Sequence, residues 1–228
     1  MTGKLYIVST PIGNLKDITL RAIETLNEVD FILCEDTRVT SILLKHYNII
    51  KKLISFNAVS EIKKIPSIIE RLQLGQSYAL VSDSGTPAIS DPGIRLISES
   101  IKSGIDIISI PGATALISAL TVSGLPTDSF VFEGFLPQKK GRQTKLQKLA
   151  EESRTIVIYE SSHRIDKLIN ELDQYFPERY IVVCRELTKK FEEYWRGFPA
   201  ELKKNLDAKT IKGEFVVVIA QKDWKIQE

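Results

Sequence analysis

The chain has 228 residues, of which 43% are hydrophobic and 26% are charged, and its formal net charge is +2. These values are typical of a soluble globular protein with one large or two small domains, and they exclude a strongly basic protein overall. No apolar run reaches the roughly 18–20 residues of a membrane span. A strand-like run near the N-terminus leaves no room for a signal peptide, and Cys34 and Cys184 read as small buried residues, so we expect a cytoplasmic protein.

The first half of the chain alternates short apolar runs with amphipathic segments. The predicted strands are Lys4–Ser9, Asp30–Leu33, Lys52–Ser55, Ser77–Ser82 and Asp106–Ile110. The predicted helices are Ile18–Leu26, Thr37–His46, Glu61–Leu74, Pro92–Lys102 and Thr114–Val122. We expect Asp17 to cap the first helix, and Asp91 to cap the fourth with Pro92 at its first helical position. This alternation predicts βαβ units and a mostly parallel sheet.

The segment Ser123-Gly-Leu-Pro-Thr-Asp128 breaks this rhythm and predicts a linker, so residues 1–122 and 123–228 are expected to form two α/β domains. Beyond it, the predicted strands are Phe130–Glu133, Thr155–Tyr159, Tyr180–Arg185, Phe191–Arg196 and Phe215–Ala220. The predicted helices are Thr144–Glu151, Arg164–Tyr175 and Phe198–Asn205. Close strand spacing around Leu187–Lys190 indicates a hairpin, and therefore a mixed second sheet.

The most informative segment runs from Ala79 to Gly93, where an apolar run ends in carboxylates, glycines and prolines. This pattern predicts a buried parallel strand followed by a rigid polar loop, and ligands of open α/β sheets bind outside the carboxyl ends of strands. Thr10-Pro-Ile-Gly-Asn14 and Pro111-Gly-Ala-Thr-Ala115 repeat the pattern after two other strands. Three such loops predict one ligand at one edge of the sheet, although Asp83 alone would also serve as a turn-capping carboxylate.

Metal and nucleotide motifs are absent from the sequence. His46 and His163 are the only histidines, and neither has ligand spacing from a cysteine, so we expect no metal site. The Walker A pattern and the glycine fingerprint of dinucleotide-binding proteins are also missing.

A basic segment follows Gly134-Phe-Leu-Pro137. Its charged members are Lys139, Lys140, Arg142, Lys145 and Lys148. Such a run is most often a solvated helix face, and the alternative is contact with the phosphates of a nucleic acid.

Several motifs together resemble one known family. They are Thr10-Pro-Ile-Gly-Asn14, Cys34-Glu-Asp-Thr-Arg38, Val81 to Gly93, Ser123 to Asp128, Gly134 to Pro137, Tyr159-Glu-Ser-Ser-His-Arg164, Cys184-Arg-Glu-Leu-Thr-Lys189 and Lys212-Gly-Glu-Phe215. They are similar to motifs of the small-subunit ribosomal RNA ribose 2'-O-methyltransferases, a branch of the tetrapyrrole methylase superfamily. The resemblance extends from about Leu5 to Ile219. Ser55-Phe-Asn-Ala-Val-Ser-Glu61 departs from it, because the family usually has a histidine there, and no role of that histidine is carried over.

The resemblance implies two α/β domains with an S-adenosylmethionine site in the cleft between them. The cofactor-binding residues that it implies are Pro11, Asp83, Gly85, Thr86, Thr114 and Ala115 from the first domain, and Tyr159 and Gly213 from the second. It also implies a homodimer that modifies a cytidine in the decoding region of small-subunit ribosomal RNA, with no membrane and no metal. RNA contacts are expected from Lys139, Lys140, Arg142 and Lys145.

The implied reaction is in-line attack of a ribose 2'-hydroxyl on the cofactor methyl group, with the target nucleotide flipped or locally opened. The residues expected to orient that ribose are Arg38, Glu160, His163 and Arg164. Further polar candidates are Asp36, Arg185, Glu186 and Lys189. The alternative role of Asp36 is a helix cap, and the alternative role of His163 is a helix-start residue, so the general base stays unassigned.

Two other functions remain open at this point. The first keeps the fold and methylates a carbon of a corrinoid or porphyrin precursor, as other members of the superfamily do. The second is a non-catalytic RNA-binding module, which the three proline- and glycine-containing loops disfavour.

Overall fold

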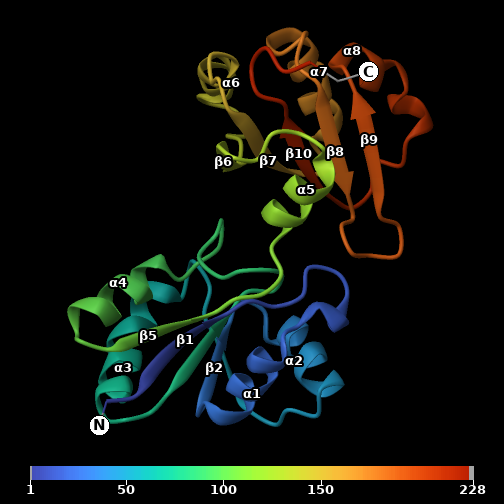
Figure 1. Ribbon diagram of the computed structural model, residues 1–228. Helices are drawn as coiled ribbons and strands as arrows, with labels where there is room; N and C mark the ends of the chain where they lie inside the picture. The colour runs from blue at the N-terminus through green and yellow to red at the C-terminus, as the bar shows by residue number, and fades with distance from the viewer. Residues whose placement is uncertain (1, 226–228) are drawn as a thin grey trace. The chain divides into compact units, whose positions relative to one another are not determined.

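The structure is a computed structural model that describes residues 2–225, apart from the side chain of residue 207 (Figure 1). The chain divides into two compact units, Met1–Thr114 and Ala115–Glu228. The boundary predicted from the sequence lay after Val122, whereas helix α5 (Ala115–Ser123) falls in the second unit, where it contacts strand β10 (Glu214–Ile219). Each unit has its own five-stranded sheet and its own apolar core.

Every strand pair in the sheet of the first unit is parallel, as the sequence predicted. In the spatial order β3-β2-β4-β1-β5, the strands are β3 (Lys52–Ser55), β2 (Phe31–Cys34), β4 (Tyr78–Val81), β1 (Lys4–Val8) and β5 (Asp106–Ile110). The helices are η1 (Leu15–Asp17), α1 (Leu20–Glu28), α2 (Thr37–His46), α3 (Glu61–Gln73) and α4 (Ile94–Lys102).

Helices cover both faces of this sheet, which explains why β4 is apolar at every position. Tyr78 and Leu80 pack with residues of α3 and α4, whereas Ala79 and Val81 pack with residues of α1 and α2. All four side chains are at most 2% exposed. Successive side chains of a strand point to opposite faces, and this alternation divides the core into two layers.

The second unit has the mixed sheet that the sequence predicted. In the spatial order β6-β7-β10-β8-β9, its strands are β6 (Phe130–Phe135), β7 (Thr155–Ser161), β10, β8 (Ile181–Arg185) and β9 (Glu193–Gly197). β6 and β7 are parallel and the other pairs are antiparallel, including the predicted hairpin of β8 and β9. The helices besides α5 are α6 (Arg142–Ala150), α7 (Ile165–Tyr175), α8 (Pro199–Lys204) and η2 (Leu206–Ala208).

Two of the predicted helix caps are wrong. Asp17 lies in η1, and the hydroxyl of Thr19 caps α1 instead, because it accepts a hydrogen bond from the amide of Ala22 at 3.1 Å. Asp91 does not cap α4: its carboxylate accepts a 2.6 Å hydrogen bond from the hydroxyl of Ser82, and the helix begins two residues beyond Pro92, after Gly93.

The prediction that Asp36 caps a helix is confirmed. Its carboxylate accepts a 2.8 Å hydrogen bond from the amide of Arg38 at the start of α2. The cap and a role in the site do not exclude each other, because a carboxylate accepts several hydrogen bonds.

Gly93 provides a test of how tightly the loop before α4 is packed. It has a φ of +131°, and an added Cβ atom would lie 2.6 Å from Cδ2 of the buried Leu80. We expect Gly93→Ala to lower the free energy of unfolding by about 2–4 kcal/mol through backbone strain and overpacking. Gly104→Ala is the matched control, since Gly104 has a φ of +68° but nothing within 4 Å of an added Cβ, and it should lose only about 1–2 kcal/mol. Equal losses in urea denaturation would show that overpacking contributes nothing.

Candidate functional site

Three loops meet at the carboxyl edge of the first sheet, after the neighbouring strands β4, β1 and β5. The loops after β1 and β4 are joined by a pair of backbone hydrogen bonds between Thr10 and Gly85, of 2.9 and 3.1 Å. The hydroxyl of Thr10 also donates to the carbonyl of Ser82 at 3.0 Å. The structure therefore places Pro11, next to Thr10, and Gly85 in linked loops, as the sequence predicted for one ligand-binding edge.

The loop after β5 is tied to the other two through Thr86. Its hydroxyl donates to the carbonyl of Ala113 at 3.2 Å and lies 2.9 Å from the hydroxyl of Ser9. A Cβ atom on Gly112 would come within 2.9 Å of Cβ of Ser9. Glycine is therefore required where these backbones approach each other, and Thr114, which ends the first unit, follows a fixed segment.

Four carboxylates gather at the same edge. Asp83 accepts a 3.0 Å hydrogen bond from the amide of Asp36 and so links the loop after β2 to the loop after β4. Burial and the charges of Asp83, Asp91 and Asp36 raise the pKa of Glu35, and burial and Asp83 raise the pKa of Asp91 although a hydrogen bond from Ser82 opposes the shift. This edge is therefore electronegative and favours a cation.

Arg38, predicted to orient a ribose, is exposed at this edge. Its side chain is 88% exposed and its guanidinium lies 2.5 Å from the Asp36 carboxylate. Hydrogen bonds from Arg38 hold the pKa of Asp36 down to about 2. The negative charge of the Asp36 carboxylate therefore offsets much of the positive charge of Arg38.

In the second unit, the pairing of β7 with β10 brings Tyr159 and Gly213 to one edge of the sheet, since Ser161 lies opposite Glu214. The Tyr159 hydroxyl accepts a 3.0 Å hydrogen bond from the amide of Leu116, so it binds the first turn of α5, which begins at Ala115. This contact, which the sequence did not reveal, gives Tyr159 a structural role in addition to the predicted one.

Gly213 lies in a crowded place next to β8. It has a φ of +109°, and an added Cβ atom would come within 2.6 Å of the Glu186 side chain. Lys189 holds that side chain, with its ammonium 2.8 Å from Glu186 and 3.1 Å from Glu214. Arg185 donates to the carbonyl of Lys212 at 2.7 Å. These polar residues therefore fix the segment that carries Gly213.

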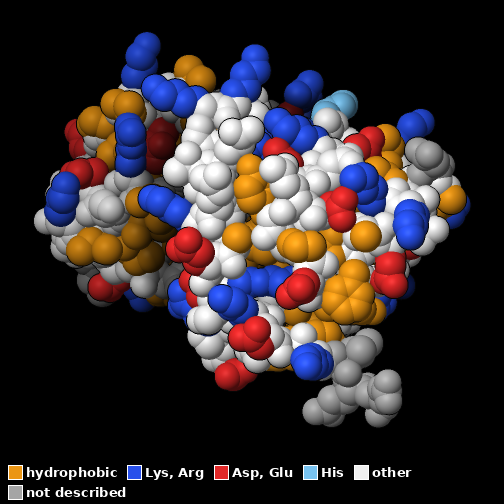
Figure 2. Space-filling model, turned by 90° about the horizontal axis from the view of Figure 1, so that it is seen from above, with side chains coloured by type: hydrophobic (Ala, Val, Ile, Leu, Met, Phe, Trp, Pro, Cys, Tyr) orange, Lys and Arg blue, Asp and Glu red, His pale blue; other side chains and the backbone are white. Residues whose placement is uncertain are grey.

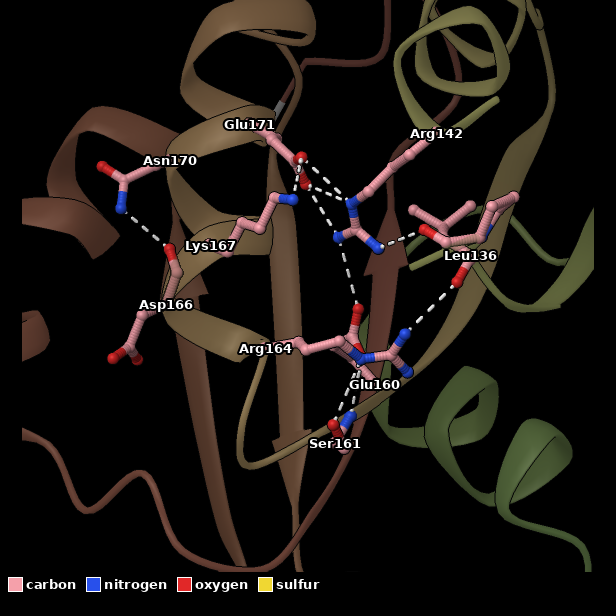
Figure 3. A network of polar contacts seen from close by, with 10 residues as sticks. Leu136, Arg142, Glu160, Ser161, Arg164, Asp166, Lys167, Asn170 and Glu171 are labelled. Atoms are coloured by element: carbon pink, nitrogen blue, oxygen red, sulfur yellow. Dashed lines mark hydrogen bonds and ion pairs between the residues drawn. The ribbon is translucent and has the colours of Figure 1, made fainter. Parts of the chain in front are cut away.

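Glu160 is the centre of a buried ion-pair network (Figure 3). Its side chain is 0% exposed, and its two oxygens lie 3.4 Å from the guanidinium of Arg142 and 2.8 Å from Nε of Arg164. It also accepts a 2.8 Å hydrogen bond from the amide of Ser161. Glu171 of α7 completes the network, 2.7 Å from Arg142. Glu160 cannot touch a substrate directly, so the prediction that it orients a ribose is corrected to holding Arg164, which is 20% exposed.

The structure corrects the prediction for Arg142. Its side chain is 2% exposed and bound to Glu160 and Glu171, so it does not face a phosphate backbone. Although burial lowers the pKa of Arg142, the hydrogen bonds and charges of both glutamates raise it overall. Arg142 shares a helix face with the buried Leu146 and Leu149, whereas the helix predicted from the sequence began only at Thr144.

The other predicted RNA-binding lysines lie at the surface. Lys139 and Lys140 are exposed, and Lys145 is half-buried with its ammonium 2.5 Å from the carboxylate of Glu133. On the face shown in Figure 2, Lys and Arg side chains are spread among Asp and Glu and do not merge into one basic patch.

His163 is exposed, at the turn between β7 and α7, and no hydrogen bond or ion pair of its side chain is found within residues 2–225.

Within residues 2–225, no group of His, Cys, Asp and Glu side chains is arranged to hold a metal ion. None of the helices within residues 2–225 is long and apolar enough to cross a membrane.

Comparison with known proteins gives a family. Residues 4–203 match the model of the tetrapyrrole (corrin/porphyrin) methylases. A "Ribosomal RNA small subunit methyltransferase I" of Synechocystis sp. is 50% identical over 96% of this chain and 79% of its own length. A protein of the same name from Thermotoga maritima is 45% identical over 97% of this chain and 100% of its own length. The chain belongs to the ribosomal RNA small subunit methyltransferase I family.

Solved structures agree with this family at the level of the fold. A uroporphyrin-III C-methyltransferase from Thermus thermophilus, in complex with S-adenosylhomocysteine, has a TM-score of 0.65 to this structure. It is 16% identical, and the match covers 95% of this chain and 97% of the other. The predicted tetrapyrrole methylase-like fold is thereby confirmed.

Between Ser55, the last residue of β3, and Glu61, the first residue of α3, the chain forms a local turn; the departure from the family that the resemblance implies for this segment stays an expectation. The Asn57 side-chain oxygen accepts hydrogen bonds from the amides of Val59 and Ser60 at 3.2 and 3.0 Å, and Phe56 is buried. In this family member the segment therefore starts α3.

The two basic residues of α6 provide a test of the ion-pair network. We expect Arg142→Met to lower the free energy of unfolding by about 3–5 kcal/mol, because it leaves the buried Glu160 with one guanidinium fewer. Lys145→Met, on the same helix, removes only a half-exposed pair with Glu133 and should lose about 1 kcal/mol or less. Chemical denaturation measures both, and similar losses for the two variants would contradict the assignment of Arg142 to the core.

Proposed function

We propose that this protein transfers a methyl group from S-adenosylmethionine to the ribose 2'-oxygen of a cytidine in the decoding region of small-subunit ribosomal RNA. One observation carries the methyltransferase activity and the ribosomal RNA substrate: identity of 45% and 50% to the two relatives over nearly the whole chain. The cofactor, the ribose oxygen and the cytidine are the finer parts of the proposal. They are supported by the resemblance of the motifs.

The acidic edge of the first sheet suits this cofactor. S-adenosylmethionine has a cationic sulfonium and an ammonium group, and a cation there would relieve the effects of burial and mutual repulsion that raise the pKa of Glu35 and Asp91. The solved uroporphyrin methyltransferase of the same fold binds S-adenosylhomocysteine. We assign the cofactor to Asp83 and to the loops that carry Pro11, Gly85, Thr86 and Thr114. Contributions from Ala115, Tyr159 and Gly213 of the second unit stay predictions.

When bound, S-adenosylmethionine supplies an electrophilic methyl group with a neutral leaving group, so little further activation is needed. The chain's contribution is then mainly alignment of the 2'-hydroxyl, which is worth at most about 7–11 kcal/mol. In our proposal Arg164 binds the RNA near the reacting ribose, and Glu160 is a positioning residue that holds Arg164. His163, exposed next to Arg164, is the candidate for receiving the hydroxyl proton, and Arg38 is a second candidate for orienting the ribose.

The alternative of tetrapyrrole C-methylation has weaker support. The similarity to the uroporphyrin methyltransferase is 16% in sequence and concerns the fold alone. The non-catalytic alternative does not explain why a cation-favouring edge and three linked loops coexist. We also propose a cytoplasmic location, because the ribosomal RNA substrate is found there, and the homodimer remains a prediction.

The product identifies the reaction. We expect small ribosomal subunits from cells that lack this protein to accept one labelled methyl group, and the modified linkage to resist alkaline cleavage, because a 2'-O-methyl group removes the internal nucleophile. Subunits from cells that contain the protein are the control and should accept none. A labelled methyl group found on a base or on a tetrapyrrole, instead of on the ribose, would refute the proposal.

The cofactor assignment is tested at Asp83. We expect Asp83→Ala to weaken S-adenosylmethionine binding more than tenfold in calorimetry, because the variant loses a charge and the link to the Asp36 amide. Asp106→Ala is the matched control, since Asp106 is an exposed aspartate at the opposite, amino edge of the same sheet, and it should bind with unchanged affinity. Equal affinity of the two variants would remove Asp83 from the site.

A further inference from the structure

Phe135 is a large apolar side chain that the fold leaves exposed. It is the last residue of β6, and its side chain is 53% exposed although Gly134 before it and Leu136 after it are buried. The register between β6 and β7 shifts between Phe132 and Gly134, and Gly134 has a φ of +58°. Such a bulge with glycine in the left-handed region redirects the side chain that follows.

Two predicted site residues of the second unit, Tyr159 and Arg164, hold the ring of Phe135. Tyr159 contacts it edge-on, with centroids 5.7 Å apart and an interplanar angle of 65°. The guanidinium of Arg164 lies 6.0 Å from the ring centroid. Arg164 is itself fixed, by the Glu160 carboxylate at 2.8 Å and by the Leu136 carbonyl at 3.4 Å. The ring therefore has a defined orientation while half of its surface stays in water.

An oriented aromatic ring beside a fixed cation matches the chemistry of an unpaired nucleotide. Each base has a flat apolar face that stacks on an aromatic side chain, and each phosphate is attracted to a guanidinium. The exposed Lys139 and Lys140 follow four and five residues later in the chain and add positive charge. The proposed reaction has its target nucleotide flipped or locally opened, and an enzyme that works in this way needs a place for the displaced base.

We propose that Phe135 stacks against an unstacked base of the RNA substrate, with Arg164 binding the adjoining phosphate. This inference rests on the proposed function, because it names the RNA-binding surface of that enzyme. It assigns a role to the side chain of Phe135 within Gly134-Phe-Leu-Pro137, a motif whose Leu136 and Pro137 carbonyls already accept hydrogen bonds from Arg164 and Arg142. If the ring instead contacts the cofactor or a second copy of the chain, the experiment below gives different results.

The experiment compares Phe135→Ala, Phe135→Leu and Phe135→Trp in methyl transfer to small ribosomal subunits from cells that lack the protein. Loss of base stacking should raise KM about tenfold or more in the alanine and leucine variants, because leucine keeps the apolar volume but has no π face. The tryptophan variant should stay within threefold of the wild type. Its fluorescence should also be quenched by the subunits more than the fluorescence of the wild type, which has Trp195 and Trp224.

Phe191→Ala is the matched control. Phe191 is 62% exposed and has the ammonium of Lys190 5.4 Å from its ring centroid, so it reproduces an exposed ring beside a cation at another place. We expect its KM to stay within twofold of the wild type. A loss equal to that of Phe135→Ala, or full activity of Phe135→Leu, would overturn the proposal.

Affinity for the subunits at several salt concentrations separates stacking from charge. Phe135→Ala should lower the affinity without changing the slope of log affinity against log salt concentration. The double variant Lys139→Glu/Lys140→Glu should make that slope less steep. A tenfold loss of S-adenosylmethionine affinity, or a change of oligomeric state in sedimentation, would assign the ring to the cofactor or to a second copy and refute stacking on RNA. If the wild type binds subunits but transfers no methyl group, the proposed function fails while the binding data still decide the role of Phe135.

Discussion

The carboxylate of Glu160 sets a constraint on much of the second unit. An ionised carboxylate without exposed surface is tolerated only when it is paired and hydrogen-bonded, and Glu160 meets this condition through Arg142, Arg164 and the amide of Ser161. Arg142 belongs to α6 and Arg164 directly precedes α7, so one side chain of β7 fixes the starts of two helices. Burying these charges has a desolvation cost that hydrophobic residues of similar volume would not have, so the positions of the two arginines are the main structural consequence of the network.

In the first unit the corresponding constraint is the parallel sheet. All five strands end at one edge, so the loops that follow adjacent strands lie next to each other whatever their sequence. The Thr10–Gly85 hydrogen bonds and the Thr86 hydroxyl then join three of these loops to one another. A preorganised site of this kind loses less conformational entropy on binding, which is an advantage for an enzyme that depends on alignment.

The elements that the sequence predicted best are those with clear boundary residues. Strands β3 and β5 and helix α2 begin and end at the predicted residues, because each has turn or cap residues next to its apolar pattern. The failures lie where two polar groups compete. Asp91 precedes a proline in a good capping position, but the Ser82 hydroxyl binds its carboxylate, and that contact depends on a residue nine positions away. Arg142 was misassigned because a charge in a basic run is usually solvated, whereas its partners on β7 and α7 become neighbours only in the folded unit.

The predicted site residues of the first unit are mainly acidic, and those of the second unit are mainly basic. This difference suits a cationic cofactor and an anionic RNA. Glu35, Asp36, Asp83 and Asp91 gather on the first unit, where they would attract a sulfonium and repel a phosphate backbone. Lys139, Lys140 and Arg164 lie on the second unit, and Phe135 adds a surface for a base. Exposed charges are screened beyond about 8–10 Å at physiological salt, so each field acts mainly on ligands in contact with its own unit. In our proposal, a net charge of +2 is therefore compatible with two separate tasks: carboxylates of the first unit select the cofactor, and cations and an aromatic ring of the second unit select the RNA.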